Sequence, residues 1–173
     1  LSNDPYLIGI LKELNIDDIE FLSSDIENNI FEIFLDRILK DIEGTSTSYK
    51  NEYKNALLNI LYTALENKQS KIIFTSLSDS QKNLIRPILD NTKICRLDDE
   101  WNIVFRHDRL KFYLEVQAIL NQKSISKTIL LEPFYYNLIG QYIAIKEISS
   151  ESLIEIQKYN PYLKKVTVHK EIK

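Results

Sequence analysis

His107 and Asp108 are the neighbouring residues in this sequence best suited to metal chemistry. An adjacent histidine and aspartate occurs in metal-dependent phosphohydrolases, where the imidazole and the carboxylate bind the same ion. Such a site also needs another histidine upstream and a distant aspartate, and the only other histidine is His169, near the end of the sequence. We therefore expect Asp108 to cap a helix and not to bind a metal.

The clustered carboxylates and the single cysteine are the other chemical candidates. Asp98, Asp99 and Glu100 could attract a divalent cation, but they lack the alternating acids and central glycine of an EF-hand, so we expect a solvated hairpin turn. Cys95 has no histidine nearby in sequence to activate it, and we expect a buried structural thiol. We predict no catalytic residue, no metal, no cofactor and no enzymatic activity. The Glu-x-Lys spacing of restriction-type nucleases occurs on predicted helix or at the chain end, at Glu52–Lys54, Glu66–Lys68 and Glu171–Lys173.

The composition is that of a folded protein with an uneven charge distribution. The chain has 173 residues, of which 44% are apolar and 27% charged, and this excludes wholesale disorder. No apolar run approaches the roughly 20 residues that cross a bilayer, and no secretory segment opens the chain, so we expect a cytoplasmic protein with no membrane partner. Leu1–Ser48 carries 11 acidic and 3 basic residues, and the remainder carries 14 acidic and 19 basic residues. This asymmetry indicates either two partners of opposite charge or a chance distribution over separate elements.

Most of the first 122 residues are predicted to be helical, because apolar residues recur every three or four positions. Ser78 and Gln81 fit a capping box (Ser-x-x-Gln), and Pro87 should kink or break the helix that begins there. The apolar run 71–74 could continue a helix or form a strand, and β-prone runs predict a hairpin over residues 93–106. The predicted helices cover about residues 6–14, 25–43 and 49–68, begin again at Ser78, and run from Asp108 to about Gln122.

A small β-rich module is predicted beyond a polar linker at residues 123–127. The predicted fold class is α+β, mainly α, with an N-terminal helical domain over residues 1–122 and a small β-rich C-terminal module over residues 128–173. A module of about 45 residues is marginal alone, so we expect it to dock on something else. Its β-prone runs are 128–131, 134–139, 141–146 and 164–169, and a helix capped by Ser149 or Ser150 interrupts them.

A winged helix-turn-helix is one interpretation of the middle of the chain. The helix over 49–68, the capped helix from Ser78 and the hairpin over 93–106 follow its order, and the second of these helices would enter the major groove. Only about ten residues separate the two helices, too few for the usual middle helix, and the net charge is −3. The candidate contacts to bases and phosphates are Gln81, Lys82, Asn83 and Arg86.

The segment from Leu57 to Leu89 resembles subunits of the GINS complex, the tetrameric replication factor of archaea and eukaryotes. In that family a long helix precedes a basic residue and an apolar run, and an acid-capped helix follows. Here the helix containing Leu57, then Lys71–Phe74, then Ser78–Gln81 follow that order. The resemblance implies a helical domain followed by a β-rich one, and a non-enzymatic scaffold that binds sister subunits, the replicative helicase and a RecJ-like partner.

The two longest predicted helices, over 25–43 and 49–68, carry wide apolar faces. Such faces either fill the core of a monomer or are covered by a partner. We expect a non-catalytic scaffold or interaction subunit of a multiprotein assembly, with other protein subunits as partners and DNA contacted indirectly. The alternatives are a winged-helix DNA-binding protein and a small subunit of a phage or defence complex. The candidate interface residues are Phe31, Phe34, Tyr53, Leu57 and Lys71.

Overall fold

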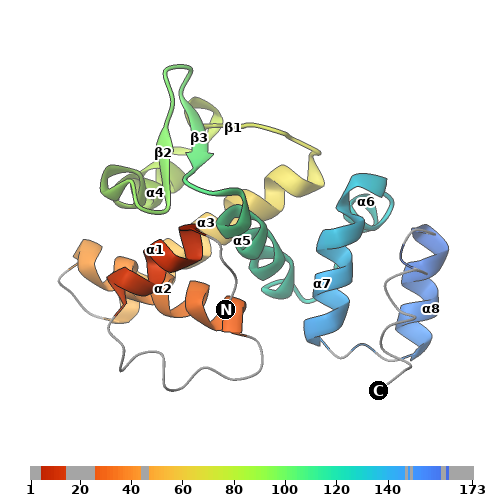
Figure 1. The fold of residues 1–173 in the computed structure, drawn as a ribbon. Helices are drawn as coiled ribbons and strands as arrows, with labels where there is room; N and C mark the ends of the chain where they lie inside the picture. The colour runs from red at the N-terminus through yellow and green to blue at the C-terminus, as the bar shows by residue number, and fades with distance from the viewer. Residues whose placement is uncertain are drawn as a thin grey trace. The chain divides into compact units, whose positions relative to one another are not determined.

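The structure, a computed structural model, confirms the predicted fold class: mainly helical α+β, with one three-stranded antiparallel sheet (Figure 1). It describes residues 5–14, 26–43, 47–146, 148, 150–160 and 163. None of the described helices is long and apolar enough to cross a membrane. In chain order the elements are α1 (Pro5–Glu13), α2 (Ile26–Glu43), α3 (Thr47–Glu66), β1 (Ile72–Ile73), the 3-10 helix η2 (Phe74–Ser76), α4 (Asp79–Asn91), β2 (Cys95–Leu97), β3 (Asn102–Phe105), α5 (Asp108–Leu120), α6 (Lys127–Leu130), the 3-10 helix η3 (Pro133–Tyr135), α7 (Tyr136–Lys146) and α8 (Ser150–Tyr159).

The chain divides by its contacts into two compact units. The first comprises Leu1–Leu57 with Lys71–Tyr113, and the second comprises Leu58–Ser70 with Leu114–Lys173. The helices α3 and α5 therefore contribute residues to both units. This division differs from the predicted boundary at residues 123–127, because the second half of α5 belongs with the residues that follow it.

The sheet of the first unit contains the predicted hairpin and one further strand. The strand β3 lies in the middle, with β1 and β2 antiparallel on either side of it. Ile72 is opposite Ile103, and Cys95 is opposite Phe105. The run that follows Lys71 thus forms a short strand and does not extend α3.

The helix α4 begins at the predicted capping box and continues through its proline. Ser78 Oγ accepts a hydrogen bond from the Gln81 backbone N–H at 3.3 Å, and Gln81 Oε1 accepts one from the Ser78 N–H at 3.0 Å. Residues on both sides of Pro87 are helical, so of the kink or break predicted there, the break does not occur. Proline cannot donate to the carbonyl four residues earlier, that of Asn83, but Asn83 is exposed and water can satisfy it.

The second unit corrects the prediction of a β-rich tail. The runs 128–131, 134–139 and 141–146 lie in α6, η3 and α7, and the described part of the tail contains no strand. The predicted strand over 164–169 lies outside the described residues, whereas the helix expected from Ser149 or Ser150 is present as α8.

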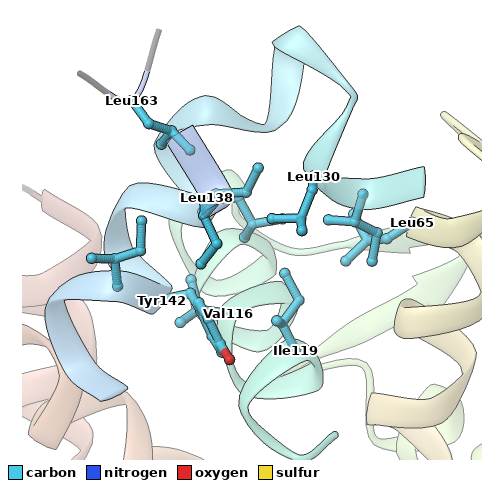
Figure 2. Close-up of a cluster of buried hydrophobic side chains, with 11 residues drawn as sticks. Leu65, Val116, Ile119, Leu130, Leu138, Tyr142 and Leu163 are labelled. Atoms are coloured by element: carbon cyan, nitrogen blue, oxygen red, sulfur yellow. The ribbon is translucent and has the colours of Figure 1, made fainter. Parts of the chain in front are cut away.

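Tertiary packing explains why these β-prone residues are helical. Buried residues in α7 recur at helical spacing, and Figure 2 shows their side chains packing against others from α5 and α6. Ser126 also caps α6, because its Oγ accepts from the Ile129 N–H at 3.4 Å. The buried cluster consists of Leu65, Val116, Ile119, Ile129, Leu130, Leu138, Ile139, Tyr142, Ile143, Ile156 and Leu163.

Candidate functional site

The turn between β2 and β3 holds a tryptophan in an unusual backbone conformation. The Trp101 N–H donates to the Asp98 carbonyl at 3.1 Å, and the Asp98 N–H donates to the Asn102 carbonyl at 3.0 Å. These bonds close a three-residue hairpin loop that ends in a bulge, where a residue with positive φ is required. Trp101 occupies that position with φ of 63°, in the left-handed region that favours glycine.

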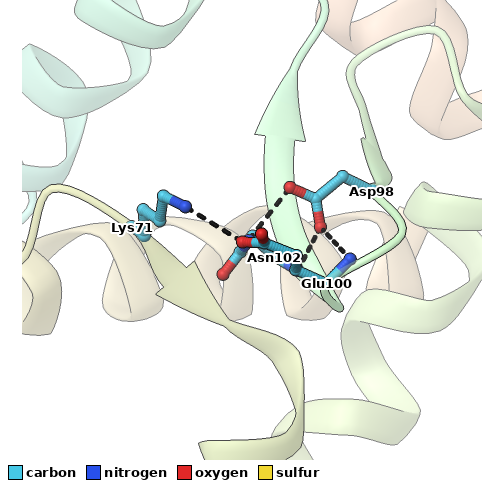
Figure 3. A network of polar contacts seen from close by, with 4 residues as sticks. All are labelled: Lys71, Asp98, Glu100 and Asn102. Carbon is cyan, nitrogen blue, oxygen red and sulfur yellow. Dashed lines mark hydrogen bonds and ion pairs between the residues drawn. The ribbon is translucent and has the colours of Figure 1, made fainter.

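A polar network holds this turn in place (Figure 3). Asp98 Oδ1 accepts from the backbone N–H groups of Glu100 and Asn102 at 2.9 and 2.8 Å, and its Oδ2 accepts from Asn102 Nδ2 at 3.0 Å. Glu100 Oε2 accepts from Lys71 Nζ at 3.0 Å and from Asn102 Nδ2 at 3.2 Å. The network therefore fixes the backbone on both sides of Trp101 and ties the turn to the residue before β1.

The hydrogen bonds of this network shift the pKa values of its members. The side-chain hydrogen bond from Asn102 lowers the pKa of Asp98, and the bond from Lys71 lowers the pKa of Glu100. The same bond to Glu100 raises the pKa of Lys71. The carboxylates of Asp98 and Glu100 are thus ionised at neutral pH and already engaged within the turn.

Three exposed apolar side chains surround this turn and the strands beside it. Trp101 is 55% exposed, Ile73 46% and Val104 39%. Val104 lies two residues from Asn102 on β3, and Asn102 is opposite Ile73, so Ile73 and Val104 share the outer face of the sheet. The Trp101 indole stacks near Phe74, with ring centroids 6.4 Å apart. We refer to Ile73, Trp101 and Val104 as the hairpin surface.

The four residues predicted to contact nucleic acid all lie on α4, but two of them are engaged locally. Gln81 completes the capping box, and Lys82 forms an ion pair with Asp79 at 3.6 Å. Asn83 is exposed, and the guanidinium of Arg86 lies 5.9 Å from the centre of the Phe74 ring.

The predicted interface residues are mostly in the core of the chain itself. Phe31, Phe34 and Leu57 are only 1%, 5% and 2% exposed, so they present no surface to a partner and this part of the prediction is wrong. Their helices use the wide apolar faces to fill this chain's own interior. Tyr53 is half-buried, and Lys71 is exposed and bonded to Glu100.

The residues singled out for catalysis have structural roles. His107 Nδ1 accepts from the Arg109 N–H at 3.2 Å, so His107, and not Asp108 as predicted, caps the start of α5. The His107 ring also stacks on Tyr6, with centroids 4.0 Å apart. The Glu52 and Lys54 pair lies on α3 as predicted, whereas Lys68 pairs with Glu132 at 2.9 Å. Within the described residues no group of three His, Cys, Asp or Glu side chains could hold a metal ion, and His169, Glu171 and Lys173 lie outside them.

No protein-family model, curated protein or solved structure matches the chain. The function of the hairpin surface must therefore be inferred from its own residues.

Trp101 was not singled out from the sequence. The signal that could have found it is a tryptophan directly after three acids in a turn that has no glycine.

Cys95 should be inert in the folded protein. Its side chain is fully buried, and burial raises the pKa of the thiol to about 12, so the reactive thiolate is scarce at neutral pH. We expect iodoacetamide to label Cys95 only in denaturant, as followed by mass spectrometry. Rapid labelling of the folded protein would contradict the structural role.

Acid should weaken the turn through its two carboxylates. Because their pKa values are lowered by folding, the stability they contribute is present above the unfolded-state values near 4 and is lost as the pH falls through the lower folded-state values. We therefore expect Asp98→Asn to be less stable than wild type at neutral pH and to lose less stability on acidification, measured by urea denaturation at several pH values. Asp99→Asn is the control, because it removes the same charge and none of these hydrogen bonds.

Proposed function

We propose that this chain is a non-catalytic interaction subunit of a multiprotein assembly, and that the hairpin surface contacts a partner polypeptide. The observation that supports this most directly is Trp101. A left-handed conformation costs a non-glycine residue about 1–2 kcal/mol, and Trp101 adopts it although more than half of its side chain is exposed. Exposed tryptophan is among the side chains that contribute most to protein interfaces.

The charges around the hairpin surface favour a polypeptide over a nucleic acid. The turn carries Asp98, Asp99 and Glu100, which would repel phosphates. The exposed stripe of α4 carries two acidic residues and one basic residue, so it forms no positive patch. Its members are Asp79, Asn83, Arg86 and Asp90.

DNA binding is the second candidate, and the sheet order supports it. In a winged helix, the strand before the recognition helix pairs with the last strand of the wing. Here β1 precedes α4 and pairs with β3, and the three-residue η2 stands where the middle helix would be. This connectivity suits a domain that contacts either DNA or protein, so the charges described above decide our preference.

Replication is the setting that the resemblance of residues 57–89 to GINS subunits suggests for such an assembly. In the apolar run after Lys71, Ile72 and Phe74 are buried and Ile73 is exposed. The β-rich second domain of that family has no counterpart among the described residues of the tail, which are helical. The proposal of an interaction subunit therefore depends on the hairpin surface and not on the family.

Affinity purification from the native host tests the interaction. We expect wild type to elute from gel filtration together with other polypeptides. The double variant Ile73→Ser with Val104→Ser should lose them, whereas Ile154→Ser, which alters a 55% exposed isoleucine of α8, should retain them. Elution of wild type as a lone monomer would contradict the proposal.

DNA binding should be weak and insensitive to the basic residues of α4. We expect fluorescence anisotropy with a labelled duplex to show little binding at physiological salt, and Lys82→Ala with Arg86→Ala to change it little. A specific DNA-binding protein would instead bind tightly, lose affinity steeply with salt, and weaken in this double variant. That result would favour the winged-helix alternative.

A further inference from the structure

The first unit contains two adjoining cavities of about 200 and about 190 Å³. Both are lined by Phe34 and Lys93, which shows that they are neighbours along α2. The 190 Å³ cavity, which we call the α1 cavity, is walled on one side by the helix α1. Neither belongs to the hairpin surface.

The α1 cavity combines positive charge with apolar walls. Among the described residues that line it, the charged ones are Lys93 and Arg106, and none is acidic. The Arg106 N–H donates to the Ile94 carbonyl at 3.0 Å, which extends the β2–β3 pairing and brings these two basic residues to the same end of the hairpin. Ile10 and Phe34 form the apolar wall, and the adjoining cavity adds Arg37 together with one acid, Asp41.

A glycine lines this cavity. Gly9 is one of only three glycines in the chain and lies inside α1, where glycine is less favourable than alanine by about 1 kcal/mol. It lines the cavity, and a Cβ added to it would meet no atom within 4 Å. Packing among the described residues therefore gives no reason for glycine at this position, and the cavity has room for a larger side chain there.

We propose that the α1 cavity binds a small organic anion, with its phosphate or carboxylate group against Arg106 and Lys93 and a compact apolar group against Phe34 and Ile10. A guanidinium and an ammonium at one end select a negative charge. The apolar wall selects against inorganic phosphate, which cannot use it. The volume admits a group the size of a substituted ring.

Phenyl phosphate is the test ligand, and benzoate is the equivalent ligand with a carboxylate. Phenol and inorganic phosphate are the controls, because each carries only one of the two groups of phenyl phosphate. In NMR titrations of the whole chain we expect saturable chemical-shift changes in α1 and at Arg106 with phenyl phosphate or benzoate. Phenol and inorganic phosphate should each bind at least tenfold more weakly. The stronger of the two anions identifies the head group. Equal binding of inorganic phosphate and phenyl phosphate, or no saturable shift at millimolar concentration, would overturn the proposal.

Two variants separate binding from folding. Arg106→Gln should lower the affinity for phenyl phosphate at least fivefold. Arg86→Gln, on α4 and outside the cavity lining, should leave this affinity unchanged. Gly9→Leu places a side chain in the cavity and should abolish binding, while the melting temperature stays the same or rises because leucine favours helix. Retained binding in Gly9→Leu, or equal losses in the two arginine variants, would show that the ligand lies elsewhere.

Discussion

Replacing Ile139 with alanine should lower the free energy of unfolding by about 2–5 kcal/mol, because it leaves a cavity in the core of the second unit. Ile139 is fully buried on α7 and belongs to the buried cluster of the second unit. Phe134 is five residues earlier in the same predicted strand, but its side chain is 88% exposed. Phe134→Ala should therefore change stability by no more than about 0.5 kcal/mol, although it removes more atoms.

Urea denaturation followed by circular dichroism measures both variants against wild type. The midpoint should fall for Ile139→Ala with little change in the slope, because the surface exposed on unfolding stays nearly the same. This pair tests the helical packing of the tail directly. A large effect of Phe134→Ala and a small one of Ile139→Ala would mean that the tail packs through another face.

The parts of the fold that were predictable are those set by local signals. The capping box at Ser78 needs only neighbouring residues, and it forms as predicted. The hairpin over 93–106 also follows from two β-prone runs and a polar turn between them. The α2 stripe repeats every four residues, which predicts a helix without any knowledge of what covers it.

The tail was not predictable, because its local preference and its packing disagree. Isoleucine and tyrosine favour strands, and Phe134–Ile139 reads as a β-prone run. In the structure Leu138, Ile139, Tyr142 and Ile143 form one buried helical face against α5 and α6, and this burial outweighs a propensity worth tenths of a kcal/mol per residue. No sequence window shows the surface against which a helix will pack.

The two candidate binding surfaces could not be predicted from the sequence for a related reason. Gly9, Lys93 and Arg106 line one cavity although the first lies more than 80 residues from the others in sequence. The exposure of Trp101 depends on how the turn closes, and the buried positions of Phe31 and Leu57 depend on the whole first unit. Apolar periodicity predicts which helix face is buried, but it does not distinguish burial in the core from burial by a partner.

Trp101→Gly should separate binding from stability more sharply than any other single change. Glycine adopts a φ of 63° without strain, so the variant recovers about 1–2 kcal/mol of backbone energy, while it loses the stacking of the indole near Phe74. We expect these effects to offset, leaving the free energy of unfolding within about 1 kcal/mol of wild type. Affinity for the partners recovered from the host should fall about 30-fold, as removal of a central interface tryptophan typically costs 2 kcal/mol or more.

Two comparison variants make this result interpretable. Trp101→Phe keeps an aromatic ring at the strained position and should retain part of the affinity, and Phe134→Ala removes an exposed ring from the second unit and should retain all of it. Urea denaturation gives the stability of each variant, and surface-plasmon resonance with the purified partner gives its affinity. If Trp101→Gly lost stability and affinity together, the tryptophan would be part of the fold; if affinity were unchanged, the partner would bind elsewhere. Loss of affinity in a protein of undiminished stability is the result that an interaction role for the hairpin surface requires, because the indole then contributes to binding a partner and not to net stability.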